Sequence, residues 1–250
     1  MQIFTHLAEW REYRAGLDGR SLGFVPTMGA LHEGHRALLE RARSENDSVI
    51  GSIFVNPTQF DDPGDLARYP RALEADVALM EGLVDAVLCP PAEELYPDGY
   101  RYRVAENEVS RLREGAHRPG HFDGVLTVVL KLFNLVAPTR AYFGEKDWQQ
   151  LELVSGMARA LFLPVQIVAC PTVRAPDGLA LSSRNRRLSP AGRTRAANFP
   201  RLLRGASSAP AAADALREAG FGVDYVEDTN GIRLGAVRLE NIRLIDNVRL

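Results

Sequence analysis

The chain has 250 residues, of which 46% are hydrophobic, 25% charged and 8% aromatic. This length allows one large α/β domain with a small annex, and the composition excludes disordered, collagen-like and disulfide-stapled chains. Thirty Lys and Arg residues against 32 Asp and Glu residues give a formal net charge of −2, so we expect neither nucleic acid nor an anionic membrane as a partner.

The two cysteines and the first residues indicate the compartment. Cys89 and Cys170 each lie in an apolar run and have no CxxC partner or metal-ligand spacing, which is typical of buried thiols in a reducing compartment. Residues 1–6 lack the basic and apolar regions of a signal peptide, and no apolar stretch is long enough to span a membrane. We therefore expect a soluble, cytoplasmic protein.

Strand-like apolar runs alternate with helical patterns as far as about residue 170. The patterns predict strands at 23–25, 48–55, 85–89, 141–143 and 165–169, and helices from 34 onward and at 66–80, 125–136 and 147–161. This alternation is typical of a parallel sheet with helices on both faces. Such sheets bind ligands beyond the carboxyl ends of their strands, where the topology switches.

The pattern changes after Pro171. Residues 174–187 are basic and loop-like, and 207–213 indicate a weak linker or a frayed helix. Short strands are predicted at 223–226 and 243–245. The predicted fold is therefore α/β: a Rossmann-like, doubly wound parallel sheet over 1–173, followed by a small α+β C-terminal domain over 174–250.

The first polar cluster, PTMGALHEGH, follows the first predicted strand and opens a helix. Its glycines let backbone amides approach a ligand, and the helix N-terminus beyond them favours an anion. His32 and His35 are three residues apart and share one side of a helical turn, which suits a polyphosphate. Capping or packing is the alternative role for both rings. A zinc site is excluded, because no third ligand stands at a matching spacing.

Two further clusters follow later strands. In VNPTQF, Asn56 can simply start a turn, whereas the carboxamide of Gln59 both donates and accepts and can orient a small hydroxylated acid. In GEKDWQQ, Asp147 can cap the next helix, and Lys146 is a candidate point charge for a phosphate.

Two basic stretches complete the set. LSSRNRR, with Arg174 upstream, can form an anion clamp of hydroxyls and guanidinium groups, or it can be a solvated surface loop. The stretch 114–122, EGAHRPGHF, is glycine-rich and basic, which by itself indicates only a functional loop.

Taken in order, the motifs PTMGALHEGH, IFVNPTQF, DLARYPR, EGAHRPGHFDGV, FGEKDWQQL and GLALSSRN resemble the pantothenate synthetase (pantoate–β-alanine ligase) family of the nucleotidyltransferase superfamily. The resemblance is dense over residues 20–190 and returns in RLIDN at 243–247. The full set is very specific, whereas HxGH alone fits many adenylyl-transferring enzymes. Residues 191–240 look shorter than the usual C-terminal domain of the family.

The resemblance implies an ATP-dependent ligase of pantothenate and coenzyme A biosynthesis. It would condense pantoate with β-alanine through a pantoyl-adenylate and release AMP and pyrophosphate. The resemblance further implies Mg²⁺ with the ATP, a homodimer, and a shortened C-terminal domain that closes as a lid.

It also implies roles for individual residues. His35, His32 and Lys146 would be catalytic, Gln59 would bind pantoate and β-alanine, Gln150 would bind pantoate, and Asn56 would support the pantoate pocket. The implied ATP site comprises Met28, Gly29, Ala30, Leu31, His32, Glu33, Gly34, His35, Gly144, Glu145, Lys146, Asp147, Val173, Leu181, Ser182, Ser183 and Arg184. The metal ligands stay unassigned.

Three other functions compete with this one. Another adenylyl transferase, of the nicotinate-nucleotide or pantetheine-phosphate type, would lack the VNPTQF and GEKDWQQ amide pairs. A non-catalytic nucleotide-binding module would not need His35, Lys146 and Arg184 intact. A fragment of an aminoacyl-tRNA synthetase would need more positive charge to hold RNA.

Overall fold

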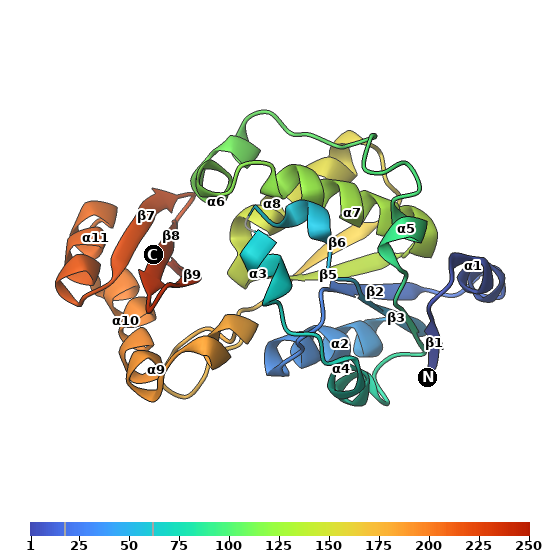
Figure 1. Cartoon of the computed structure of the whole chain (residues 1–250), viewed down its shortest axis with the longest axis horizontal. Coiled ribbons are helices and arrows are strands. Elements are labelled where there is room, and N and C mark those ends of the chain that lie inside the picture. The colour runs from blue at the N-terminus through green and yellow to red at the C-terminus, as the bar shows by residue number, and fades with distance from the viewer. Residues whose placement is uncertain (18, 62) are drawn as a thin grey trace. The chain divides into compact units, whose positions relative to one another are not determined.

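The computed structural model describes residues 1–17, 19–61 and 63–250 (Figure 1). The chain forms two compact units. The first comprises Met1–Leu31, His35–Phe143 and Gln149–Cys170, and the second comprises His32–Gly34, Gly144–Trp148 and Pro171–Leu250. The sequence analysis set a single boundary after Val173, whereas the structure changes unit after Cys170 and adds two short upstream segments to the second unit.

A six-stranded sheet in the order β1-β4-β3-β2-β5-β6 is the framework of the first unit, and its described pairings are parallel. The strands are β1 (Gln2–Phe4), β2 (Leu22–Thr27), β3 (Ser48–Ile53), β4 (Ala86–Leu88), β5 (Arg140–Gly144) and β6 (Gln166–Cys170). Strand order runs one way from β2 to β4 and the other way from β5 to β6. The topology therefore switches between β2 and β5, whose carboxyl ends lead into the segments MGALH and EKD.

Helices cover both faces of this sheet, as predicted (Figure 1). The longer ones are α1 (Leu7–Ala15), α2 (Glu33–Glu45), α4 (Leu73–Met80), α7 (His121–Val136) and α8 (Trp148–Ala160). The shorter ones are α3 (Pro63–Ala67), α5 (Ala92–Leu95), α6 (Arg113–His117) and the 3₁₀ turns η1 (Pro57–Gln59), η2 (Val109–Arg111) and η3 (Glu145–Asp147).

Side-chain alternation along the strands separates two hydrophobic cores. Phe24 on β2 and Ile50 on β3 pack in the core that includes α1, α7 and α8. Their neighbours Val25 and Val49 pack in the core that includes Leu39 of α2 and residues of α4. The near-continuous apolarity of these strands is therefore explained by burial on both faces.

Three local differences from the sequence prediction have physical causes. Strand β1 and helix α1 were missed, because the three residues of the edge strand are largely exposed and carry no periodic signal. The helix expected over 66–80 divides into α3 and α4, since Pro70 has no N–H to continue it. Strand β2 continues through Pro26, where the register with β3 persists but the register with β5, which covers Gly23 and Phe24, has ended.

The second unit contains a three-stranded antiparallel sheet, β7 (Gly222–Thr229), β8 (Ile232–Leu239) and β9 (Ile242–Arg249). It also contains η4 (Ser183–Arg187), α9 (Pro190–Ala196), α10 (Asn198–Gly205) and α11 (Ala209–Glu218). Strand β8 was missed because Gly235 interrupts its apolar pattern. A Cβ at this glycine would lie 3.0 Å from Leu203 Cδ1, so the helix α10 packs directly on the strand.

Two further observations bear on the predictions. The expected weak linker at 207–213 forms the start of α11, because the Ser208 side chain caps the helix at Ala211 and Pro210 fits the first turn. Cys170 is a buried free thiol, whereas Cys89 is half-buried, and burial raises the pKa of Cys89 to about 11. Within 1–17, 19–61 and 63–250, no helix is long and apolar enough to cross a membrane.

Candidate active site

The loop after β2 makes a left-handed turn. Thr27 Oγ1 donates a hydrogen bond to the Ser52 carbonyl at 2.7 Å and accepts one from the Gly29 N–H at 3.2 Å. Gly29 has φ +79° and Ala30 has φ +53°, a conformation that favours glycine. The turn then leads into α2.

Asp76, on α4, fills the concave side of this turn. Asp76 is 3% exposed, and its carboxylate accepts hydrogen bonds from the N–H groups of Ala30 at 2.9 Å and Leu31 at 2.7 Å. A Cβ at Gly29 would lie 2.8 Å from Asp76 Oδ2, so this position requires glycine. Backbone amides of this loop were expected to approach a ligand, and two of them, those of Ala30 and Leu31, are engaged by Asp76 instead.

Asp76 was not among the predicted site residues, although its position in the sequence carries a signal. In the predicted helix, Asp76 is four residues before the fully buried Met80, and residues so spaced share a helix face. An acidic residue on a buried face needs hydrogen-bond donors, and the amides of the loop supply them.

His32 is a neutral hydrogen-bonding group in the second unit. Its Nδ1 accepts a hydrogen bond from the Gly34 N–H at 3.1 Å, which puts the ring proton on Nε2. Burial, and then the charges of Lys146 and Arg186, lower the pKa of His32 to about 4, against an opposing effect of Asp147. At pH 7 the ring is therefore neutral and offers one N–H donor. His35, in the first turn of α2, is half-buried.

A buried network surrounds Asn56, which is 1% exposed. Asn56 Nδ2 donates to Gln59 Oε1 at 3.0 Å and to the Gly124 carbonyl at 3.2 Å. Its Oδ1 accepts from the hydroxyls of Tyr96 at 2.8 Å and Thr58 at 2.9 Å. Both ends of the Asn56 amide are thus occupied inside the protein, and it acts on any ligand through Gln59.

Gln59 lies at the end of η1 and is 7% exposed. Its Nε2 contacts Met28 Sδ at 2.9 Å, which joins η1 to the loop after β2. A Cβ at Gly124 of α7 would lie 2.4 Å from the Thr58 carbonyl oxygen and 2.8 Å from the Gln59 Cα. Gly124 is therefore what allows η1 to lie directly on α7.

The stretch RPGH anchors the backbone of Gln59. His121 Nδ1 lies 2.8 Å from the Gln59 carbonyl oxygen, and Arg118 Nη2 donates to the same oxygen at 3.3 Å. Because a carbonyl only accepts, His121 Nδ1 carries the proton and Nε2 faces Arg118 Nη1 at 3.1 Å. This gives the glycine-rich stretch at 114–122 a place in the Gln59 site, which its composition alone did not reveal.

The adjacent residues Gln149 and Gln150 have different environments. Gln149 is 4% exposed, donates to the carbonyls of Val109 and Leu112, and accepts from the Glu114 N–H. It therefore anchors the loop before α7. Gln150, the residue expected to bind pantoate, lies half-buried in the first turn of α8.

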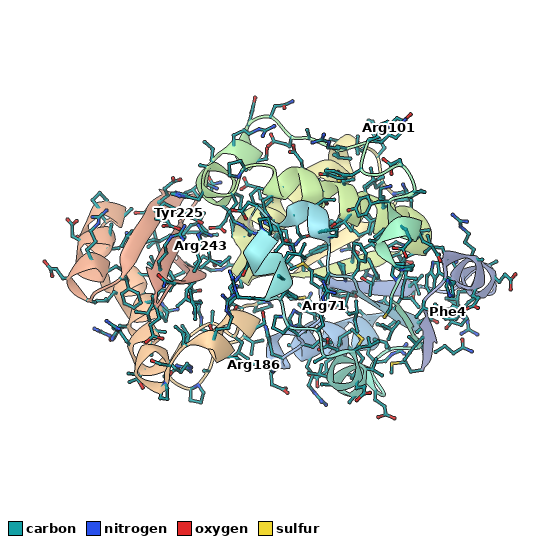
Figure 2. The ribbon with its side chains drawn as sticks, viewed as in Figure 1. Phe4, Arg71, Arg101, Arg186, Tyr225 and Arg243 are labelled. Carbon is teal, nitrogen blue, oxygen red and sulfur yellow. The ribbon has the colours of Figure 1, made fainter. Side chains whose placement is uncertain are left out.

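A small pocket in the second unit is lined by apolar residues, among them Leu179 and Phe199, and by cationic and polar ones. Its lining includes Lys146, Ser182, Arg184, Asn185 and Arg243. The Lys146 side chain is 17% exposed, and its Nζ lies 3.8 Å from Asp147 Oδ1. Figure 2 shows Arg243 on β9 and Arg186 on η4, both in this unit. The cationic side chains of this lining are of the kind that bind phosphate oxygens.

The SSR segment is shaped by its own backbone and by a cap. The Leu181 N–H donates to the Val173 carbonyl at 3.0 Å, and Ser182 Oγ caps η4 by accepting from the Arg184 N–H at 3.3 Å. Arg186 and Arg187 are exposed, which agrees with the solvated-loop alternative for that end of the stretch.

The predicted site residues thus fall into two groups. The first unit holds Met28, Gly29, Ala30, Leu31, His35, Asn56, Gln59 and Gln150. The second unit holds His32, Glu33, Gly34, Gly144, Glu145, Lys146, Asp147, Val173, Leu181, Ser182, Ser183 and Arg184. Among the residues that the structure describes, no group of three or more His, Cys, Asp or Glu side chains could hold a metal ion.

A parallel sheet with polar clusters after β2, β3 and β5 defines a Rossmann-like α/β protein. The family model described as pantoate-beta-alanine ligase matches residues 2–249. A pantothenate synthetase of Bdellovibrio bacteriovorus is 53% identical over 250 residues. The match covers 100% of this chain and 99% of the relative. One of Legionella pneumophila (strain Corby) is 51% identical over 252 residues and covers 100% of both. The chain belongs to the pantoate–β-alanine ligase family and is an enzyme of that family.

Solved structures agree. The pantothenate synthetase of Thermus thermophilus has a TM-score of 0.91 at 47% identity and covers 100% of this chain and 99% of its own. The Francisella tularensis pantoate-beta-alanine ligase, complexed with beta-gamma ATP and beta-alanine, has a TM-score of 0.95 at 40% identity and covers 100% and 97%. Because this chain covers almost all of each relative, the shortening expected at 191–240 does not distinguish it from them.

Proposed function

We propose that this enzyme joins pantoate to β-alanine in two steps, through a pantoyl-adenylate, and releases pyrophosphate and AMP. The observation that carries the proposal is the pocket of the second unit, where Lys146, Ser182 and Arg184 line one small cavity. The complex of the Francisella tularensis relative with beta-gamma ATP and beta-alanine supports the choice of substrates.

In the first step, a carboxylate oxygen of pantoate attacks the α-phosphorus of ATP. The bond from the α-phosphorus to the bridging oxygen breaks, and pyrophosphate leaves. Two anions meet in this step, so positioning and charge neutralisation dominate the barrier. We propose that Lys146 and Arg184 neutralise the negative charge and that His32 acts as a neutral N–H donor. His35 is assigned to the same step, as the family resemblance implies.

In the second step, the neutral amine of β-alanine attacks the acyl carbon of the adenylate. The bond from that carbon to the AMP oxygen breaks, AMP leaves, and the amine proton passes to solvent or to the departing phosphate. We assign Gln59 and Gln150 to the orientation of pantoate, because carboxamides can bind hydroxyl and carboxylate groups without adding charge. Asn56 positions Gln59 through its amide network.

The remaining assignments are part of the same proposal. Lys146 and the SSR segment belong to the second unit, so we assign part of the ATP site to it, and we propose that this unit closes over the nucleotide. The described residues supply no cage for a metal, so a Mg²⁺ would be held by triphosphate oxygens and water, and no step here depends on it. A cytoplasmic homodimer stays an expectation from the family.

Exchange of labelled pyrophosphate into ATP tests the two-step route. Exchange should require pantoate and ATP but proceed without β-alanine, whereas net AMP formation should require all three substrates. Exchange that depends on β-alanine would contradict the adenylate. A dinucleotide product would instead identify another adenylyl transferase.

A further inference from the structure

The two faces of strand β9 have different surroundings. Successive side chains of a strand point to opposite faces. Ile242, Leu244 and Val248 belong to the hydrophobic core of the second unit. The alternate residues lie on the other face: Arg243, Ile245, Asn247 and Arg249. Arg243 and Ile245, together with Leu244, line the pocket that contains Lys146.

Asn247 joins that second face to the turn η3. Its Nδ2 donates hydrogen bonds to the carbonyl of Glu145 at 2.8 Å and to the carbonyl of Lys146 at 3.1 Å. The side chain is 8% exposed, so both carbonyls are bonded away from bulk water. One amide group thus fixes two consecutive peptide units, including the peptide that carries the Lys146 side chain.

Asn247 is itself held in place by its neighbour. The side chain of Asp246 is fully buried and accepts two hydrogen bonds from Arg174, at 2.7 Å and 2.9 Å. Asp246 Oδ1 also accepts from the Asn247 N–H at 2.8 Å, and Arg174 donates to the Asn247 carbonyl at 2.9 Å. A bidentate pair of this kind fixes orientation as well as distance. The backbone of Asn247 is therefore rigidly placed before its amide reaches η3.

We propose that Asn247 is a positioning residue for Lys146: by binding the carbonyls of Glu145 and Lys146, it sets the peptide from which the ammonium group reaches the nucleotide. The inference rests on the proposed role of Lys146 in adenylate formation. It gives a role to the C-terminal RLIDN motif, whose residues are not among those predicted to bind a ligand.

A double-mutant cycle tests this inference. Asn247→Leu keeps the volume of the side chain but has no donor, and Lys146→Ala removes the ammonium group. We expect Asn247→Leu to slow pantoate-dependent ATP–pyrophosphate exchange by about 10- to 100-fold, as a misplaced group does. If Asn247 acts through Lys146, the double variant should match Lys146→Ala within about twofold.

Arg249→Ala is the matched control. Arg249 lies on the same face of β9, where its guanidinium group contacts the Glu145 carboxylate at 3.1 Å and its side chain is 74% exposed, so its removal should leave exchange unchanged. If Asn247→Leu does not fold by circular dichroism, Asn247→Asp takes its place, since a carboxylate keeps the shape but cannot donate.

The outcomes separate the two proposals. Losses that multiply in the double variant, or a fully active Asn247→Leu enzyme beside an impaired Lys146→Ala enzyme, overturn the positioning role alone. A fully active Lys146→Ala enzyme overturns the assignment of Lys146 and with it the positioning role. An impaired Asn247→Leu enzyme together with a double variant no slower than Lys146→Ala supports both.

Discussion

The two units organise their polar groups in opposite ways. In the first, the amides and hydroxyls around Asn56 bond to one another, and Asn56 and Gln59 are almost fully buried. In the second, the turn that carries Lys146 is fixed through its backbone carbonyls, while the ammonium group lies at a pocket, 3.8 Å from Asp147 Oδ1.

Charge explains the difference. A neutral amide can be buried at little cost when all of its hydrogen bonds are made, whereas a buried charge needs a partner or a pKa shift. In the first unit, specificity therefore depends on the buried hydrogen-bond network around Asn56 and Gln59. In the second, the Lys146 ammonium group lies at the pocket, and the backbone of its turn is immobilised. Substitutions in the first unit should therefore change stability and pantoate binding together, and those in the second should change rate.

The largest expected effect is that of Lys146→Ala. Removing a group that stabilises developing charge typically lowers a rate by about 10²–10³-fold. We expect that loss in pyrophosphate exchange with little change in melting temperature. Arg217→Ala, which removes an exposed cation of the same unit, serves as the control and should be neutral. A comparable loss in both variants would indicate a general charge effect instead.

Asn56→Ala should act on stability as well as on the site. It removes the hydrogen bonds that Asn56 makes to the Tyr96 hydroxyl, the Gly124 carbonyl and Gln59 Oε1 inside the protein, so the free energy of unfolding should fall by about 1–3 kcal/mol. Urea denaturation measures the loss, and the KM for pantoate should rise in parallel. Tyr102→Phe, at a tyrosine that is 75% exposed, should change neither quantity.

Two helical glycines offer a closely matched comparison. At Gly124 a Cβ would clash with the backbone of η1, so Gly124→Ala should destabilise by about 1–3 kcal/mol and raise the KM for pantoate. At Gly156 of α8 a Cβ meets nothing within 4 Å, so Gly156→Ala should stabilise by about 0.4–1 kcal/mol. Equal effects of the two substitutions on the KM for pantoate would show that Gly124 has no specific role in pantoate binding.

The smallest effect concerns the protonation of His32. Its pKa in the folded protein, about 4, lies below the ordinary value of 6.5, so the unfolded chain binds this proton first. The contribution of His32 to stability is therefore constant above pH 6.5 and falls as the pH drops from about 6.5 to about 4.

Imidazole NMR signals can follow that titration. The midpoint for His32 should lie near pH 4 and should rise in Lys146→Ala, because the charge of Lys146 contributes to the lowering. His6 is an internal reference, since its hydrogen bond to Glu94 raises its pKa above 6.5. A His32 midpoint near pH 6.5 in the unmodified protein would contradict the assignment of His32 as a neutral N–H donor.

The sequence by itself determined the alternation of strands and helices, the motifs that follow the strands, and the family. Periodicity reports burial one residue at a time, so runs such as 48–55 predicted β3, and short motifs carry their own turn chemistry. It did not reveal that Asp76 occupies the amides of the MGALH loop, that His121 and Arg118 anchor Gln59, or that Asn247 binds the Lys146 turn. Each of those contacts joins residues far apart in the chain. Only tertiary packing decides which buried donor meets which acceptor, and that pairing determines whether a polar residue supports the site or is left to bind a ligand.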